Sequence, residues 1–154
     1  GAEAAAAHGQ LLKKRREQLD PRVRQRLEGG SKVSAADYIK AMRSRAALRA
    51  QVLEALHSVD LLAMPTCAIA ASKLGAEEAD VGDSRVSVLS ALTRLTRLSN
   101  LTGFPSVTVP CGCSNDGLPS GLQRIGRPLD EVTVLQAAYA YEQATEWHER
   151  RPDL

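Results

Sequence analysis

The sequence predicts an α/β fold in which a small sheet is flanked by helices, and three patterns in its 154 residues support this. Apolar residues recur at helical spacing through much of the first sixty residues. Residues 59–65 then form a short, almost wholly apolar run that ends at a proline, which is typical of a buried strand. Residues 106–109 alternate between polar and apolar side chains and lie between two prolines, which predicts a second strand. We divide the chain into a helical segment, 1–58, and a strand and helix segment, 59–154.

The first part of the helical segment contains residues that mark where helices begin and end. Residues 2–19 are Ala-rich and then basic, and their composition is compatible with a helix. Asp20 precedes Pro21, which predicts an N-cap followed by proline at the first helical position. Gly29-Gly30 predicts the end of this short helix near residue 28.

A longer helix and a long loop are expected next. Ser34 and Asp37 have the spacing of a capping box, with aspartate in place of glutamate, so a helix should cover about 35–57. Beyond the strand at 59–65, residues 66–86 are small, acidic and glycine-containing, and they predict an irregular loop. Residues 87–98 return to helical spacing and predict one further helix.

The remaining residues predict a hairpin and a final helix. Residues 106–110 and 122–126 should pair antiparallel, because Asn115-Asp116-Gly117 between them supplies positions that tolerate positive φ. Pro110 and Gly112 are expected to end the first of these strands, and Gly126 the second. The last helix should begin at residue 130 or 131 and be closed by Pro152, with Trp147 and His148 at its end.

Composition limits the classes of function. With 44% hydrophobic and 25% charged residues the chain has the make-up of a globular protein, and no apolar run approaches the roughly 20 residues that a membrane-spanning helix needs. Residues 1–60 carry 12 Lys and Arg against 7 Asp and Glu, but Tyr38 is the only aromatic residue among these charges. A solvated helix face is therefore expected, and neither nucleic acid nor a membrane is expected as a partner.

The cysteines suggest a compartment but no metal site. Cys67, Cys111 and Cys113 are odd in number, and with no export signal visible this favours a reducing compartment, so a cytoplasmic location is expected. A structural zinc site needs four ligands, whereas the three histidines are scattered along the chain. No metal and no cofactor are expected.

Three stretches, SNLTGFPSVTVPCG, DGLPSGLQRIGRP and LDEVTVLQAAYAYEQATEWHERRP, resemble the C-terminal part of the amidase-signature family in order and spacing. Residues 60–66 are similar to the apolar Pro-Thr strand that precedes them in that family. The resemblance implies the C-terminal part of an α/β/α sandwich, with a mixed sheet and flanking helices, and makes 1–58 and 59–154 segments of one amidase domain. The motif positions with a structural role are Asn100, Thr102, Gly103, Pro105, Pro110, Gly112 and Gly126.

Physical reasons for these motif positions stand beside the resemblance. Gly103 permits a tight entry into the strand that follows Pro105. The Asn100 amide and the Thr102 hydroxyl are expected to bond backbone groups of neighbouring loops, and glycosylation at Asn100 is not expected.

The resemblance implies acyl transfer by a Ser–cis-Ser–Lys triad, in which a lysine acts through a bridging serine on the nucleophilic serine. In the family these residues lie N-terminal to the matched region, within or beside a Gly/Ser-rich stretch whose N–H groups can stabilise an oxyanion. This sequence has no such stretch: Gly29-Gly30-Ser31-Lys32 is better explained as a helix end, and Ser72-Lys73 lacks the glycines. We therefore expect no catalytic residue in this chain and no activity from it alone.

Substrate contact is the role that the resemblance leaves to this chain, because in the family the loop after the Pro-Thr strand and the helix before the Asn-Leu-Thr motif approach the pocket. The expected substrate-binding residues are Thr66, Cys67, Thr93 and Arg97. A glutamine-dependent amidotransferase is expected to hold the substrate ammonium with a carboxylate, and residues 86–100 contain none, which weakens that alternative.

Two classes of function stay open. The first is a C-terminal piece of an amidase, or of a glutamine amidotransferase subunit, which binds a small amide substrate only within the full-length enzyme. Its partner is then the missing N-terminal half or, through exposed apolar surface, a second copy. The second is a stand-alone, non-catalytic domain that binds a protein or a polyanion.

Overall fold

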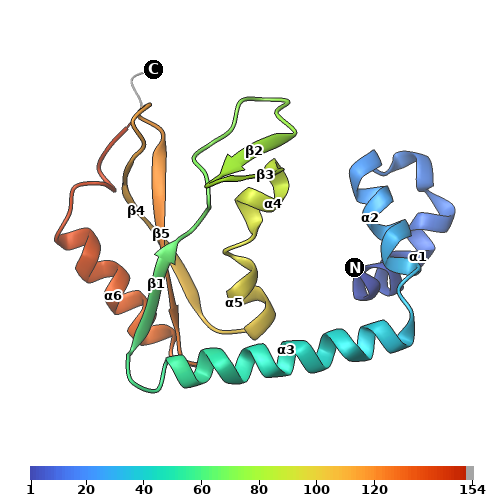
Figure 1. Ribbon diagram of the computed structural model, residues 1–154, viewed down its shortest axis with the longest axis horizontal. Coiled ribbons are helices and arrows are strands. Elements are labelled where there is room, and N and C mark those ends of the chain that lie inside the picture. Colours follow the sequence, from blue (N-terminus) through green and yellow to red (C-terminus); the bar gives the residue numbers. More distant parts are fainter. Residues whose placement is uncertain (152–154) are drawn as a thin grey trace. The chain divides into compact units, whose positions relative to one another are not determined.

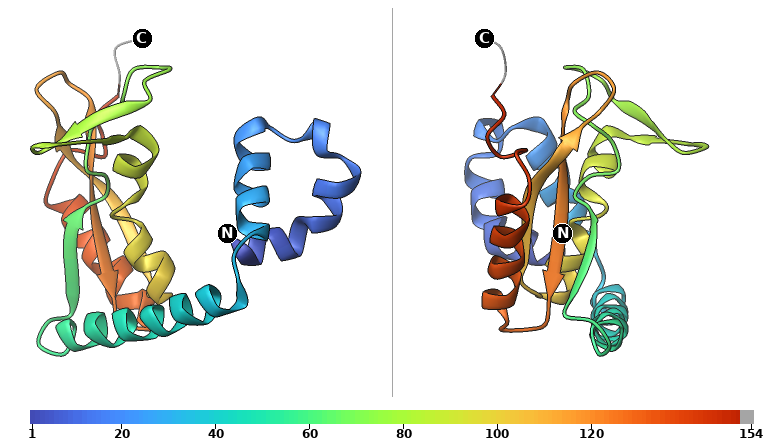
Figure 2. Two further views of the ribbon diagram at one scale, coloured as in Figure 1. Left: turned by 45° about the vertical axis from the view of Figure 1, so that its right-hand side comes forward. Right: turned by 90° about the vertical axis from the view of Figure 1, so that its left-hand side faces the viewer.

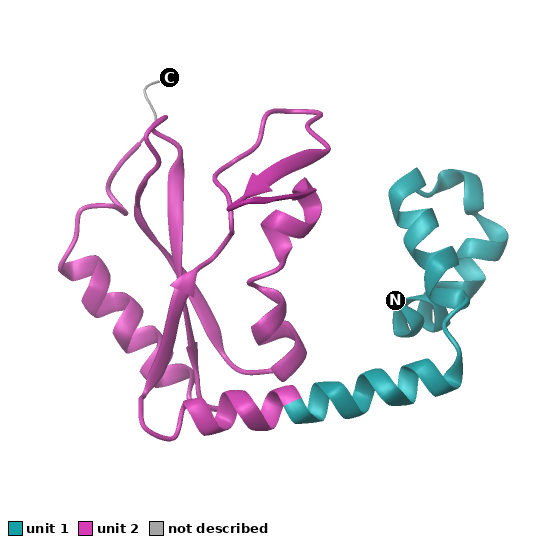
Figure 3. Cartoon of the chain, in the orientation of Figure 1, with its two compact units in different colours: residues 1–47 teal, residues 48–154 magenta. Residues whose placement is uncertain are grey.

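A computed structural model describes residues 1–151 of the chain, which forms two compact units, Gly1–Ala47 and Leu48–Leu154 (Figure 3). The first unit is helical in the residues that have regular structure. The second unit contains all the strands found in the described residues.

The first unit contains α1 (Ala2–Lys14), the short 3-10 helix η1 (Arg16–Gln18), α2 (Pro21–Ser31) and the first part of α3 (Ala35–Ala55). The predicted N-cap of α2 is confirmed, because the Asp20 carboxylate accepts the Arg22 N–H at 2.8 Å. The predicted end of α2 at Gly29-Gly30 is wrong, since the helix continues to Ser31. A Cβ atom on Gly30 would meet the backbone of Gly1, so this glycine permits the close approach of α1 and α2.

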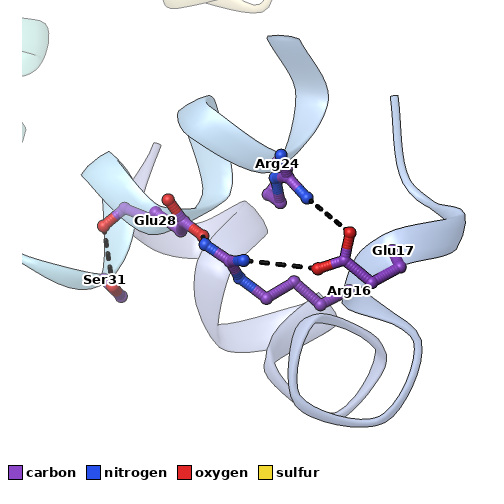
Figure 4. A network of polar contacts seen from close by, with 5 residues as sticks. All are labelled: Arg16, Glu17, Arg24, Glu28 and Ser31. Atoms are coloured by element: carbon purple, nitrogen blue, oxygen red, sulfur yellow. Dashed lines mark hydrogen bonds and ion pairs between the residues drawn. The ribbon is translucent and has the colours of Figure 1, made fainter. Parts of the chain in front are cut away.

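Charged side chains join η1 to α2 (Figure 4). Arg16 lies between two carboxylates, with Nη2 at 2.7 Å from Glu28 and Nη1 at 3.4 Å from Glu17. Glu17 also reaches Arg24 at 3.3 Å. The hydrogen bond to Glu28 raises the pKa of Arg16 above its ordinary value, with the charge of Glu28 adding to it. Because these groups are exposed, each pair contributes little to stability.

The capping box of α3 is confirmed, in a modified form. The Ser34 hydroxyl oxygen accepts the Asp37 N–H at 3.1 Å, and it donates to the Asp37 carboxylate at 2.7 Å. Within the same unit, the Tyr38 hydroxyl donates to the Glu3 carboxylate at 2.9 Å, which joins α3 to α1.

The second unit is built on a three-stranded sheet of β1 (Leu61–Pro65), β4 (Ser106–Cys113) and β5 (Pro119–Gly126), in the order β1-β5-β4 (Figure 1). The predicted strand at 59–65 and the predicted hairpin are confirmed, and Val107 pairs with Arg124 in the hairpin. Every strand pairing within residues 1–151 is antiparallel. The parallel pairs that a mixed sheet also contains are not among them.

Helices cover both faces of this sheet, which confirms the α/β fold class. Helix α6 (Glu131–Gln143) lies against one face, while α4 (Val88–Thr93) and α5 (Arg97–Thr102) lie on the other (Figures 1 and 2). Alternation along the strands therefore sends Ile125, Gln123 and Gly121 of β5 toward α4 and α5. The core on that side is formed by Val52, Leu56, Phe104 and Ile125.

Strand β4 does not end where proline was expected to end it. It continues through Pro110 to Cys113, with an irregularity in register between Pro110 and Gly112. Because β4 is the edge strand of the described sheet, the missing N–H of Pro110 costs no pairing on its outer side. Pro110 and Gly112 thus mark a bulge and not a strand end.

Part of the predicted loop 66–86 is a second, two-stranded sheet. Strands β2 (Glu78–Val81) and β3 (Ser84–Ser87) pair antiparallel, and Arg85 lies 2.8 Å from Glu78. The turn contains Gly82 with φ of +58°, followed by Asp83. A glycine with positive φ at the first central position is typical of a tight hairpin turn, and the prediction overlooked it.

The single helix predicted over 87–98 is two short helices, α4 and α5. The carbonyl oxygens of Ala91 and Leu92 accept from Ala68 N–H at 3.2 Å and from the Cys67 thiol at 3.3 Å. Those carbonyls would bond residues 95 and 96 in a continuous helix. The segment that follows β1 therefore interrupts the helix, and the chain begins a new one at Arg97.

The last helix is shorter than expected. Helix α6 ends at Gln143, and the Ala144 N–H bonds the Ala140 carbonyl at its end. Trp147 and His148 follow it in turns, so the prediction that they close the helix is wrong. Pro152, predicted to end it, lies outside the described residues.

Candidate functional site

A hollow of about 720 Å³ opens beside the sheet in the second unit. Its wall combines the segment after β1, the end of the β4–β5 hairpin and the α4–α5 segment. None of its lining residues carries a charged side chain. They are Pro65, Thr66, Cys67, Ala68, Ile69, Ala70, Ala71, Leu92, Leu95, Thr108, Cys111, Ser114, Pro119, Ser120, Gly121 and Leu122.

Two hydroxyl groups meet over the central strand at the floor of this hollow. Thr66 follows β1 and Thr108 lies on β4, and their Oγ1 atoms are 3.1 Å apart. Between them, β5 places Gly121, whose N–H and carbonyl belong to the strand ladder, and the Thr66 N–H bonds its carbonyl at 2.9 Å. A Cβ atom at Gly121 would come within 2.8 Å of both threonine side chains. The missing side chain is what allows the two hydroxyls to meet.

Two hydrogen bonds fix the chain that leaves β1 against α4. Cys67 and Ala68 donate to the carbonyls of Leu92 and Ala91, as described above. The apolar run 68–71 therefore lines the hollow together with Leu92 and Leu95. The same two bonds that interrupt the helix thus shape this wall.

The sequence-predicted site residues separate into two pairs. Thr66 and Cys67 line the hollow. Thr93 and Arg97 are not among the lining residues; the Thr93 hydroxyl donates to the Leu89 carbonyl at 2.7 Å and accepts from the Arg97 guanidinium at 3.0 Å. This second pair bridges α4 and α5.

Two of the predicted motif positions, Thr102 and Gly103, organise the end of α5. Gly103 adopts φ of +70° and ends the helix in a left-handed cap, with its N–H bonded to the Ser99 carbonyl at 2.8 Å. The Thr102 hydroxyl bonds the Leu98 carbonyl of its own helix at 2.8 Å, so the predicted bond to a neighbouring loop is wrong. The Thr102 carbonyl instead accepts from Arg49, whose guanidinium stacks on Phe104 at 4.7 Å. Asn100 lies in α5 and is exposed.

The other motif positions hold the sheet and α6 together. The Pro105 carbonyl accepts the Gly126 N–H at 3.0 Å, where β4 begins and β5 ends. A Cβ atom at Gly126 would overlap Val134 of α6, so glycine is required for this helix to pack on the sheet. Near the other end, a Cβ atom at Gly112 would touch Trp147 at 4.0 Å.

Sequence reasoning missed Thr108 and Gly121. Thr108 was counted only as a polar residue of an alternating strand, and nothing local relates it to Thr66, which lies 42 residues away. Gly121 belongs to the Gly-Leu-Gln motif, and a glycine within a strand is a known sign of close approach by another group.

The groups that line the hollow can hold a ligand through hydrogen bonds and apolar contacts. Hydroxyl, thiol and apolar groups line it, and the described residues place no base beside a nucleophile there. In residues 1–151, no cluster of three or more His, Cys, Asp or Glu side chains is arranged to hold a metal ion. None of the helices of that stretch combines the length and apolar character needed to cross a membrane.

The fold and the hollow together define the class of protein. It is an α/β segment in which three parts of the chain form the wall of a hollow large enough for a small ligand. Residues 2–135 match the model of the Amidase family. The chain belongs to this family.

Individual relatives agree with this assignment. An amidase of Pseudomonas putida is 44% identical over 153 residues, which are 99% of this chain and 33% of that protein. A glutamyl-tRNA(Gln) amidotransferase subunit of Moorella thermoacetica is 44% identical over 119 residues, 77% of this chain and 23% of that protein. The crystal structure of an amidase superposes with a TM-score of 0.88 at 33% identity, over 93% of this chain and 33% of the other. The chain thus spans a third or less of the length of these relatives.

Proposed function

We propose that this chain acts as the C-terminal part of an amide-hydrolysing enzyme, in which it supplies one wall of the substrate pocket and the adjoining sheet. The observation that carries the proposal is the hollow over Thr66, Thr108 and Gly121, in a chain that belongs to the amidase family. Both segments of the chain, 1–58 and 59–154, are parts of one amidase domain in this proposal.

The roles of the predicted site residues follow from their positions. Thr66 and Cys67 contact the substrate, because both line the hollow. Thr93 and Arg97 hold α4 to α5 through their mutual hydrogen bond. They support the wall without lining the hollow. The nucleophile and the base come from the part of the enzyme that this chain does not include.

Hydrolysis is favoured over glutamine-dependent amidotransfer by the character of the wall. An amino-acid substrate carries an ammonium and a carboxylate, and burial of either group without a partner is unfavourable. The lining residues include no carboxylate, lysine or arginine that would pair with them. The enzyme is proposed to act in the cytoplasm, with the remainder of the amidase domain as its partner.

Activity measurements with and without the missing part test this proposal. The 154-residue chain alone should not hydrolyse aryl or aliphatic amides, because loss of triad residues typically lowers rates by several powers of ten. A chimera in which this chain replaces the matching third of the Pseudomonas putida amidase should be active.

Two controls make the result interpretable. The substitution Gly121→Leu in the chimera should abolish activity if the substrate binds against this wall, because the leucine side chain would occupy the hollow. The variant Gly29→Leu, at an exposed glycine of α2 where a Cβ atom would meet nothing within 4 Å, is the matched control and should keep activity. Turnover by the isolated chain, or an inactive but folded chimera, would contradict the proposal.

A further inference from the structure

A buried guanidinium lies on the face of the sheet that α6 covers. Arg124 is in β5, the middle strand, and pairs with Ala63 of β1 and Val107 of β4. Only 8% of this residue is exposed, and its Cζ atom lies 4.5 Å from the centroid of the Tyr141 ring on α6. Because side chains alternate along a strand, Arg124 faces away from Gln123, and it does not line the hollow.

The charge of Arg124 has no counterpart within residues 1–151. No carboxylate of that stretch forms an ion pair with it, and its buried Nη1 atom has no hydrogen-bond partner there. Arg49 provides a contrast, because its guanidinium also stacks on an aromatic ring but donates to the Thr102 carbonyl. An apolar side chain beside Val107 and Ala63 would avoid the cost of an unpaired buried charge. The arginine therefore points to an acceptor outside these residues.

The sheet is open next to this arginine. Helix α6 packs mainly on β4 and β5, and β1 lies to the side of α6 in the right-hand view of Figure 2. On this face β1 presents Ala63 and Pro65, and both are exposed. Residues directly opposite each other in paired strands are about 5 Å apart. A segment of chain that lay over Ala63 would therefore be adjacent to Arg124.

Resting on the proposed function, we propose that the strip formed by Ala63 and Pro65 is an interface for the remaining part of the amidase domain, and that a carboxylate of that part pairs with Arg124. Two observations select this occupant. The chain covers only 33% of the length of the Pseudomonas putida amidase, so most of such a domain lies outside it. The unpaired guanidinium requires an anion, and a carboxylate accepts two parallel N–H bonds at the guanidinium edge while Tyr141 stays stacked on its face.

The buried charge also gives this interface specificity. A segment that covered the strip without supplying a carboxylate would leave the guanidinium buried and unpaired on both sides, which disfavours docking in a wrong register.

Removal of the charge should have opposite effects in the isolated chain and in the assembled domain. In the 154-residue chain, Arg124→Leu should raise the thermal midpoint by about 2 °C or more, because it removes an unpaired buried charge. In the chimera with the Pseudomonas putida amidase it should lower the midpoint by about 2 °C or more, because the partner carboxylate is left unpaired. Circular dichroism measures both. The control Arg49→Leu should lower both midpoints, since its acceptor lies within this chain.

Two results of this comparison would overturn the proposal. A lower midpoint of the isolated chain with Arg124→Leu would mean that the guanidinium already has its partners in this chain. A raised or unchanged midpoint of the chimera would exclude a carboxylate from the remaining part of the domain.

A carboxylate placed in the strip tests the pairing within the chain itself. Ala63→Glu should give a thermal midpoint about 1–3 °C above that of Ala63→Gln, the neutral variant of the same shape. The difference should vanish when Arg124→Leu is also present. Fluorescence of Trp147, the one tryptophan of the chain, reports the second unit. Equal midpoints of the two Ala63 variants with Arg124 in place would refute access to the guanidinium from β1.

Sodium acetate distinguishes a free carboxylate from one that the enzyme carries. Compared with sodium chloride at equal ionic strength, acetate should stabilise the unaltered chain no more than it stabilises Arg124→Leu. Stabilisation that depends on Arg124 would show a site for a free carboxylate and would overturn the assignment to a domain interface. All these measurements are of unfolding and not of turnover, so a failure here is distinguishable from an inactive chimera, which is the failure of the proposed function.

Discussion

The Arg127 guanidinium bonds the Leu56 carbonyl, with 3.2 Å between Nε and the oxygen, although 71 residues separate the two in sequence. The same guanidinium reaches the Val59 carbonyl at 2.8 Å and the Asp60 carboxylate at 3.3 Å. Carbonyls beyond the end of a helix have no partner within it, and Arg127 supplies partners at the end of α3. One side chain after β5 thus fixes the turn through which α3 enters β1.

Replacement of Arg127 should destabilise the second unit. Arg127→Ala should lower the free energy of unfolding by about 1.5–3 kcal/mol, because several hydrogen bonds to a charged group are lost together. Arg127→Lys should recover only a small part, since an ammonium lacks the planar fork that bonds two carbonyls at once. Urea denaturation followed by circular dichroism measures both changes. The control Arg85→Ala removes an exposed pair with Glu78 and should cost at most about 1 kcal/mol; equal costs for the two alanine variants would contradict the prediction.

Two adjacent glycines of α2 should respond to alanine in opposite directions. A Cβ atom on Gly29 would point into open space, so Gly29→Ala should stabilise the helix by up to about 1 kcal/mol. Gly30→Ala should destabilise the first unit by about 1–3 kcal/mol, because the new methyl group would overlap the backbone of Gly1. Thermal unfolding of the two variants makes the comparison. The same sign for both would show that α1 does not pack on Gly30 as described.

Tyr38 should ionise at higher pH than an ordinary tyrosine. The hydrogen bond that it donates to Glu3, and the repulsion between the Glu3 charge and a tyrosinate, raise its pKa above the usual value of 10.0. The contribution of this bond to stability is therefore complete below about pH 10 and is lost as the pH rises through the raised pKa. Absorbance at 295 nm, in a background in which Tyr139 and Tyr141 are phenylalanine, reports Tyr38 alone. Glu3→Gln should move the titration to lower pH, and an unchanged midpoint would exclude the bond.

The outer face of α6 should promote self-association of the isolated chain. Val132, Leu135 and Tyr139 follow one another at helical spacing and are 65%, 60% and 64% exposed. Such a stripe of apolar side chains favours contact with another surface. Light scattering should show dimers or larger species, and Leu135→Lys should shift the population to monomer, whereas Gln51→Lys, at an exposed position of α3, should not. A monomer at high concentration for the unaltered chain would refute this.

The sequence predicted features that depend on nearby residues. Asp20 and Ser34 cap their helices as expected, because the bonded N–H groups lie two or three residues away. The β4–β5 hairpin was likewise predictable, since its turn residues and the alternation of its strands are adjacent in the chain.

Features that depend on distant residues could not be predicted in this way. The interruption between α4 and α5 is caused by Cys67 and Ala68, some 25 residues earlier, so the helical spacing of residues 87–98 concealed it. Pro110 stays within a strand because β4 lies at an edge, which only the strand order reveals. At the hollow, the resemblance to the Pro-Thr strand predicted Thr66. Thr108 and Gly121 come close to Thr66 only because their strands pair in the sheet, so the local sequence did not reveal them.

The position of β5 in the sheet determines when the second unit can fold. Both β1 and β4 pair only with β5 among the described strands, and β5 is the last of the three in sequence. The partner that β1 and β4 share in this sheet is therefore synthesised last, more than fifty residues after β1. Contacts of such long sequence separation slow folding, whereas the local helices of residues 1–47 can form early. The three-stranded sheet beside the hollow can thus form only after the hairpin turn has been translated.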